Sequence, residues 1–280
     1  MPRRGDFLSK YAGKTNFRFF GCEVRVLGLL LATLLGAFPI PSQSTDTGRQ
    51  IPPDATQIVS HLVQSNQNRA ALLQHYEGCR RYSLDYTGFP SAKSAEMVVD
   101  ARFSAPAEKQ FRIVREDGSK LLLNRVLKGL LDGEKEALAE ENRNRTALTP
   151  ENYEFRLAGA DAIEGRPQYV LEVAPRSRNK FLYRGRIWVD ATDFAVSRIS
   201  AEPAKTPSVW ISHIAIEHEY AKFGDFWLPV RNTSITKVRL GGTAKLRIDY
   251  LNYSFGQSNT APDADVCGAA SGEAQLPAGP

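Results

Sequence analysis

The second half of the chain consists of short stretches of strand-forming residues joined by tight turns, and this pattern most constrains the fold. The clearest stretch covers residues 183–203, where two strand patterns flank the tetrapeptide from Asp190 to Asp193. Asp and Thr favour a turn in such a gap because their side chains bond nearby backbone amides. The stretch therefore predicts a β-hairpin. Asp190 and Asp193 could also form a catalytic carboxylate pair, but a role in the turn fits their location better.

Similar strand patterns recur along most of the chain. We expect nine or ten strands, in the hairpin and at residues 81–87, 95–104, 110–115, 153–158, 168–174, 210–223, 226–240 and 243–255. Gly224-Asp225 and Gly241-Gly242 separate neighbouring patterns and favour tight hairpins. Because parallel neighbours would need long crossovers, the short connections predict an antiparallel meander.

Two segments have helical periodicity instead. The first begins at Asp54, which can cap the first turn, continues its apolar pattern to Tyr76 and ends at Gly78. The second spans about residues 120–140 and carries an apolar stripe of Leu123, Val126, Leu127, Leu130 and Leu131. It could be a core helix docked on the sheet or a mobile lid, and both roles are compatible if it covers a cavity.

These elements predict a mainly β, α+β fold. Two helices can cover only one side of a long meander, so the sheet must curl to bury its apolar face. We expect an open half-barrel with the helices on the concave side. A single domain would span residues 45–255, with the helical lid at about 120–140 and a disordered Gly/Ala/Pro-rich tail at 256–280.

The charge of the chain is concentrated at its N-terminus. The net charge is +5, and residues 1–44 hold six Lys or Arg and two acidic residues. The remainder, with 30 basic and 29 acidic residues, is almost neutral. A neutral body argues against nucleic acid as a partner, since phosphate contacts need a basic face.

The same N-terminal region has the layout of a secretory signal peptide. Basic residues precede the uncharged apolar run at 26–38, and small residues follow at Ser42 and Ser44. We expect cleavage near Ser44 and a periplasmic product. The alternative is an inner-membrane anchor formed by residues 26–40, although the run is shorter than the ~20 residues of a spanning helix.

Two cysteines, Cys79 and Cys267, remain after such a cleavage. An exported protein can form a disulfide between them. The sequence leaves a free thiol in the C-terminal tail equally open.

The order of these elements resembles the outer-membrane lipoprotein-sorting proteins, the LolA/LolB-like superfamily that includes the RseB-type sensors. The resemblance covers about residues 54–255 and is carried by hairpin and packing motifs at 185–190, 198–199 and 226–229. It implies a half-barrel and helical lid around a hydrophobic cavity for acyl chains. It also implies a buried arginine in the cavity, for which Arg102, Arg112 and Arg198 are candidates by strand position.

The resemblance and the apolar patterns together suggest a ligand-binding wall and lid. We expect it to be formed by Met97, Phe103, Leu123, Leu127, Leu130, Phe155, Trp188, Trp210, Ile214, Ile216, Trp227 and Tyr250. An ordinary packed sheet core would use the same side chains. The implied function is an exported carrier that shields lipid or lipoprotein acyl chains during outer-membrane lipoprotein sorting. The implied partners are those chains and a membrane-bound donor or acceptor protein.

Other functions remain open at this stage. A periplasmic sensor of the RseB type would use the same fold, and a hydrolase with an unrecognised site is a remote alternative. We expect no enzyme, cofactor or metal, because the sequence shows no nucleophile elbow, zinc-ligand spacing or phosphate loop. The four histidines are His61, His75, His213 and His218. His213 and His218 lie five residues apart on one predicted strand, so they should face opposite sides.

Overall fold

The computed structural model describes residues 53–206, 211–239, 241–256 and 266–270. The chain divides into two units, Met1–Gln50 and Ile51–Pro280. The first unit contains the expected signal peptide and anchor, which lie outside the described residues, as does most of the expected tail. No helix in the described part of the chain is both long enough and apolar enough to span a membrane.

The second unit is built on one open sheet in which every pairing is antiparallel. The strands are β1 His75–Gly88, β2 Lys93–Ser104, β3 Glu108–Gly118, β4 Tyr153–Ile163, β5 Arg166–Pro175, β6 Tyr183–Asp190, β7 Val196–Pro203, β8 Ile211–Phe223, β9 Phe226–Val238, β10 Gly242–Tyr250 and β11 Ser254–Phe255. Their order is β3-β2-β1-β10-β9-β8-β7-β6-β5-β4, with β11 on β1. The predicted antiparallel half-barrel is confirmed.

The helices differ from the prediction in number and in one boundary. They are α1 Ala55–Leu72, α2 Lys120–Leu122, the π-helical η1 Leu123–Leu127, α3 Lys128–Leu138, α4 Glu140–Thr146 and α5 Val266–Ala270. Asp54 caps α1 as expected, since its side chain accepts a hydrogen bond from the Gln57 amide. The helix ends before Tyr76, which lies in β1 opposite Phe103 and stacks on its ring. Cross-strand pairing therefore overrides the helical periodicity there.

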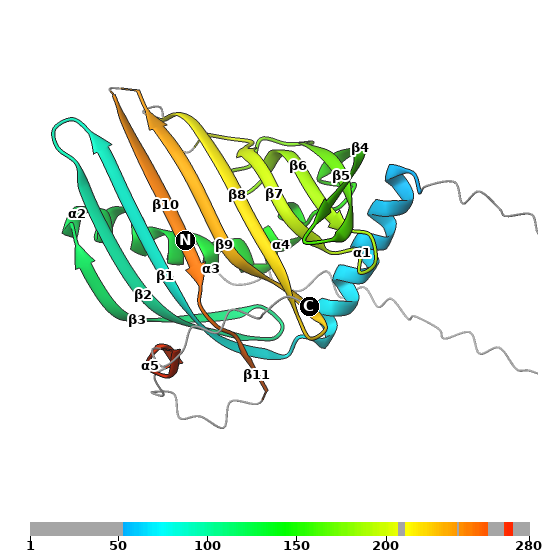
Figure 1. Ribbon diagram of the computed structural model, residues 1–280, viewed down its shortest axis with the longest axis horizontal. Helices are drawn as coiled ribbons and strands as arrows, with labels where there is room; N and C mark the ends of the chain where they lie inside the picture. Colours follow the sequence, from blue (N-terminus) through cyan, green and yellow to red (C-terminus); the bar gives the residue numbers. More distant parts are fainter. Residues whose placement is uncertain (1–52, 207–210, 240, 257–265, 271–280) are drawn as a thin grey trace, which may run out of the picture. The chain divides into compact units, whose positions relative to one another are not determined.

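The strand order requires a helical segment to cross the sheet. β3 and β4 are consecutive in sequence but form the two opposite edges of the sheet. The connection between them carries α2, η1, α3 and α4, and Figure 1 shows these helices passing behind the central strands. We call the continuous helical segment from Lys120 to Leu138 the crossing helix. It matches the helix predicted at 120–140.

Two clusters of buried side chains lie on the face of the sheet that the helices cover, which we call the inner face. One cluster packs α1 against the strands β4 to β7, and contains Ile58, Leu62, Leu171, Ile187 and Ile199 among others. The other packs the crossing helix against β1 and β2, and includes Tyr82, Met97, Leu123 and Leu127. The fully buried cores therefore lie towards opposite ends of one sheet.

The outer face carries charged residues in alternation. One cross-strand row runs Arg198, Glu219, Arg231, Asp249 and Arg81 across five neighbouring strands. Opposite charges on directly facing residues stabilise a solvent-exposed sheet modestly, by about 0.2–1 kcal/mol a pair. The row marks this face as the hydrated one.

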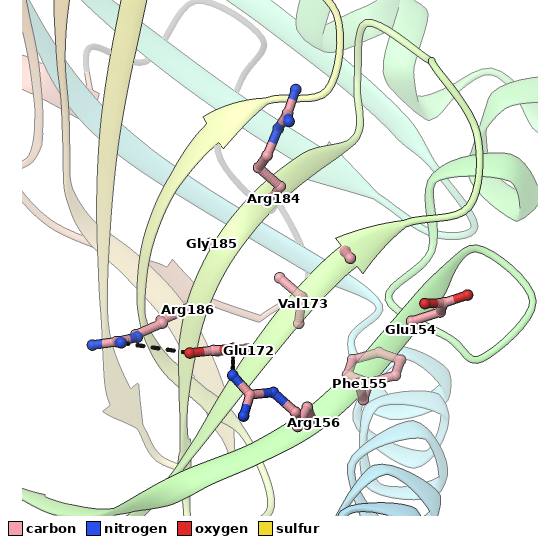
Figure 2. Close-up of a pocket in the computed structure, with 9 residues that line it drawn as sticks. Glu154, Phe155, Arg156, Glu172, Val173, Arg184, Gly185 and Arg186 are labelled. Atoms are coloured by element: carbon pink, nitrogen blue, oxygen red, sulfur yellow. Dashed lines mark hydrogen bonds and ion pairs between the residues drawn. The ribbon is translucent and has the colours of Figure 1, made fainter.

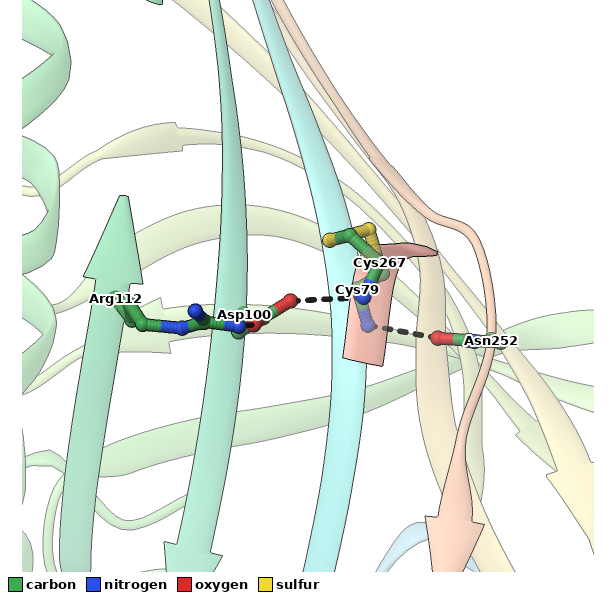
Figure 3. The surroundings of a disulfide bond; sticks show 5 residues. All are labelled: Cys79, Asp100, Arg112, Asn252 and Cys267. Carbon is green, nitrogen blue, oxygen red and sulfur yellow. Dashed lines mark hydrogen bonds and ion pairs between the residues drawn. A yellow bond between two sulfur atoms is a disulfide. The ribbon is translucent and has the colours of Figure 1, made fainter. Parts of the chain in front are cut away.

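A disulfide on the outer face attaches the C-terminal segment to the sheet. Cys79 and Cys267 are bonded, with their Cα atoms 5.0 Å apart, so the pairing left open by the sequence is made. The Cys79 amide donates to Asn252 and the Cys267 amide donates to Asp100, which also pairs with Arg112 (Figure 3). The bond holds α5 against β1 and β2.

Candidate functional site

The inner face is less deeply buried at its centre than at its two ends. There, β8, β9 and β10 run between the two core clusters, and their inward residues are only half-buried. We call this surface the central inner face. It consists of Ile214, Ile216, His218, Tyr220, Asn232, Ser234, Thr236, Ala244, Leu246, Ile248 and Tyr250. Close-packed cores bury their side chains fully, whereas these inward residues stay partly accessible, so this surface is the candidate site.

A polar stripe divides the central inner face. The inward residues of β9 are Asn232, Ser234 and Thr236, whereas those of β8 and β10 are mostly apolar. The apolar residues extend the two core clusters, because Ile216 packs on one and Leu246 packs on the other. A ligand on this surface would therefore meet apolar walls on both sides and hydrogen-bonding groups along the middle.

A buried arginine connects the sheet to the crossing helix. The Arg80 side chain on β1 is 2% exposed, and its Nη1 lies 2.9 Å from Oε2 of Glu134 on α3. Lys109 on β3 binds the same carboxylate. The Arg80 guanidinium also lies over the rings of Tyr250 and Phe111, 4.8 and 5.5 Å from their centroids. One carboxylate of the crossing helix is thus held by two cations of the sheet.

The protonation of this cluster follows from its contacts. Burial alone would raise the pKa of Glu134, but Lys109 and Arg80 together hold it below its ordinary value. Burial likewise raises the pKa of Tyr250, against the opposing effect of Arg80. Glu134 is therefore ionised and Tyr250 is neutral at neutral pH, so the Tyr250 hydroxyl can donate or accept a hydrogen bond.

A hollow of about 360 Å³ opens beside the central inner face, between α1 and the strands β7 to β9. Its lining includes Arg69, Leu73, Leu148, Tyr220, Trp227 and Leu228. Arg69 donates to the backbone oxygens of Asp193 and Phe194, both at 2.9 Å, and so docks α1 on the β6–β7 turn. Burial raises the pKa of Tyr220 to about 12, so its hydroxyl stays neutral. The hollow is predominantly apolar, with one cation at its side.

A larger hollow, of about 660 Å³, lies over the strands β4, β5 and β6 near an edge of the sheet. Figure 2 shows that its lining is strongly charged, and that Glu172 bridges Arg156 and Arg186. Its charges are largely exposed and partly paired with one another. Because this hollow lies near a sheet edge and not between the two buried cores, we place the candidate site on the central inner face, although the hollow beside that face is smaller.

The structure brings several of the predicted wall and lid residues together. Ile214, Ile216 and Tyr250 lie on the central inner face, and Trp227 lines the hollow beside it. Met97, Leu123 and Leu127 are fully buried in a core cluster, and Leu130 packs against it half-buried. Phe155 packs on the other cluster, and Phe103 stacks on Tyr76.

Of the other two predicted wall residues, one faces outward and the other lies outside the described residues. Trp188 lies between Ile187 and Val189, which are both fully buried on the inner face, so its own side chain points to the outer face. There its indole donates to Asp161, 2.9 Å away, and Arg198 lies over its ring. Trp210 falls outside the described residues.

The three arginines proposed for the buried position are also on the outer face. Arg102 pairs with Glu77, Arg112 with Asp100 and Arg198 with Glu217. The buried arginine is instead Arg80, which the sequence analysis missed. The sequence did contain a signal for this. Arg80, Tyr82 and Leu84 are two residues apart along one strand, so the strand period alone puts Arg80 on the same apolar face as the other two.

The histidines and the aspartate pair considered for an enzyme site lie apart in the described structure. His213 and His218 face opposite sides of β8 as predicted, with His218 inward and His213 beside Glu202. Asp190 and Asp193 serve the β6–β7 turn, where Asp190 accepts the backbone amides of Thr192 and Asp193. Within the described residues, one set of potential ligand atoms lies close enough together to hold a metal ion, and it comes from Cys79, Asp100 and Cys267. Both of its sulfur atoms are in the disulfide.

Comparison with known proteins gives similarities of fold alone. No family model matches the chain, and no curated protein matches it. Among solved structures, the chain is similar to LolA-superfamily proteins. One from Nitrosomonas europaea has 13% identity and a TM-score of 0.33, with 75% of this chain and 96% of that chain covered.

Two further structures were also similar. A DUF1329 family protein from Desulfovibrio piger has 13% identity and a TM-score of 0.36, with 74% of this chain and 95% of that chain covered. The Pseudomonas aeruginosa MucA/MucB complex has 12% identity and a TM-score of 0.24, with 68% and 93% covered.

Proposed function

We propose that this protein is an exported, non-enzymatic carrier that shields the acyl chains of a lipid or lipoprotein during outer-membrane lipoprotein sorting. The observation that carries the proposal is the half-buried, largely apolar central inner face between two complete cores. A chain lying there would gain about 0.8 kcal/mol for each methylene removed from water. The predicted wall residues Ile214, Ile216, Trp227 and Tyr250 would contact it.

The crossing helix would control access to this surface. It forms the first part of the connection that joins the two edge strands, β3 and β4. Its fully buried residues, Leu123 and Leu127, anchor one end on β1 and β2, and Glu134 binds Arg80 further along. In the proposed cycle, cargo enters under the helix and leaves when a membrane-bound acceptor binds it more tightly.

The proposal is tested by filling the central inner face. Ser234 is inward and half-buried, so Ser234→Trp would occupy the space of an acyl chain. Its neighbour Ile235 is on the outer face and 43% exposed, so Ile235→Trp is the matched control. Each protein would be purified from the exported fraction, weighed by native mass spectrometry and extracted with organic solvent for lipid analysis.

We expect acyl lipid with the native protein and with Ile235→Trp, and little or none with Ser234→Trp. An apo mass for the native protein, together with no binding of an added fluorescent fatty-acyl probe, would overturn the carrier function. Equal lipid content in Ser234→Trp and the native protein would show that the lipid binds somewhere other than the central inner face.

A further inference from the structure

One polar atom of the central inner face lacks a partner. Oδ1 of Asn232 is buried and accepts no hydrogen bond from any group in the described part of the chain. The other end of the same amide is fixed, because Nδ2 donates to the Tyr250 hydroxyl, 3.0 Å away. The side chain is therefore held in one orientation with its acceptor unused.

The position of Asn232 in the sheet shows what surrounds this acceptor. Its cross-strand neighbours are Ile248 on β10 and His218 on β8, and apolar core residues continue the row on both sides. That row runs Met97, Tyr82, Ile248, Asn232, His218 and Ile199. Asn232 and His218 thus form the polar centre of an otherwise apolar row.

His218 adds no charge to this centre. Burial lowers its pKa, against the opposing effect of Glu217. The imidazole is therefore neutral at neutral pH. A neutral His and an amide recognise hydrogen-bonding groups, not ions, and an anionic headgroup would gain no ion pair from these two side chains.

We propose that Asn232 Oδ1 accepts a hydrogen bond from the bound lipid. The donor would be an N–H or O–H group at the point where the hydrocarbon chain joins the polar headgroup. This inference rests on the proposed function and narrows its ligand class. A buried acceptor without a partner is costly, and a ligand donor would remove that cost. Acyl amides and long-chain alcohols would be preferred over esters and ethers of the same length.

The test uses two pairs of ligands, and in each pair one member carries an N–H or O–H donor that the other lacks. N-methylhexadecanamide is compared with methyl hexadecanoate, and hexadecanol with its methyl ether, each displacing a fluorescent fatty-acyl probe from the full mature protein. We expect the donor-bearing member of each pair to bind about three- to tenfold more tightly, the usual range for one hydrogen bond. A preference in one pair alone would identify the donor as amide or hydroxyl.

Two variants locate the effect. Asn232→Leu keeps the side-chain size and removes the acceptor, so the donor preference should fall to about onefold while ester binding persists. Thr233→Ala, the next residue on β9 and on the outer face, should keep the preference. Circular dichroism and probe binding would confirm that both variants fold.

The outcomes separate this inference from the function on which it rests. Equal binding within both pairs, or a preference that survives Asn232→Leu, would overturn the role of Asn232 and leave the carrier function standing. Failure of all four ligands and the probe to bind the native protein would overturn both.

Discussion

Arg80 and Glu134 join the sheet to the helix that crosses it, through a 2.9 Å ion pair between Nη1 and Oε2. The arginine is 2% exposed and the carboxylate 29%, so the pair lies at the boundary of the interior. Removing one partner of such a pair leaves the other charge buried and uncompensated. The contact therefore fixes where the crossing helix sits on β1.

Glu134→Gln should destabilise the protein by about 2 kcal/mol, between the effects typical of exposed and fully buried pairs. The measurement is the free energy of unfolding from chemical denaturation. Glu136 on the same helix pairs with Lys180, and both side chains are about half exposed. Glu136→Gln is the control, with an expected change within about 0.5 kcal/mol. Equal effects of the two substitutions would contradict a special role for the Arg80 pair.

The same carboxylate predicts an acid sensitivity. Lys109 and Arg80 lower the pKa of folded Glu134 below its ordinary value of 4.5. A lowered folded pKa contributes stability that is fully present above the unfolded-state value and is lost as pH falls through the folded value. The free energy of unfolding should therefore fall from about pH 5 downward, and less steeply in Glu134→Gln. Identical pH profiles for the two proteins would exclude Glu134 as a contributor.

The disulfide should stabilise the fold through the chain that it closes. Cys79 and Cys267 are 188 residues apart in sequence, and such a bond restricts the unfolded chain. Cys267→Ser should lower the free energy of unfolding by about 2–4 kcal/mol. Adding dithiothreitol should lower the unfolding midpoint of the native protein similarly and leave that of Cys267→Ser unchanged. A native midpoint that does not respond to the reductant would contradict this.

Asp190 should be essential to the β6–β7 turn. Its carboxylate is fully buried and binds Arg166, with Nε 2.7 Å from Oδ2, besides the two turn amides. Asp190→Asn loses the charge and one acceptor, at a cost of about 2–3 kcal/mol. Asp225→Asn, at the exposed turn between β8 and β9, is the control and should leave the thermal midpoint unchanged. A stable Asp190→Asn would show that the turn holds without the buried charge.

Local structure could be predicted from short stretches of the sequence. The capping of α1 by Asp54, the helix from residue 120 and the turn at Asp190 each depend on neighbours a few residues away. The strand period also predicted that His213 and His218 face opposite sides. Each of these features is set by backbone propensity and short-range hydrogen bonds, which a single stretch of sequence contains.

The residues that share the candidate site come together only through long-range pairing of the strands. The boundary at Leu72 was missed because Tyr76 is held by pairing with a distant strand. The strand period could have placed Trp188 outward and Arg80 inward, but only relative to their neighbours. Which face the helices cover, and which strands lie between the two cores, depends on β1 pairing with β10 across more than half of the chain. Such long-range pairing is decided by the burial of the whole sheet, so Asn232 and Glu134 became recognisable only in the folded protein.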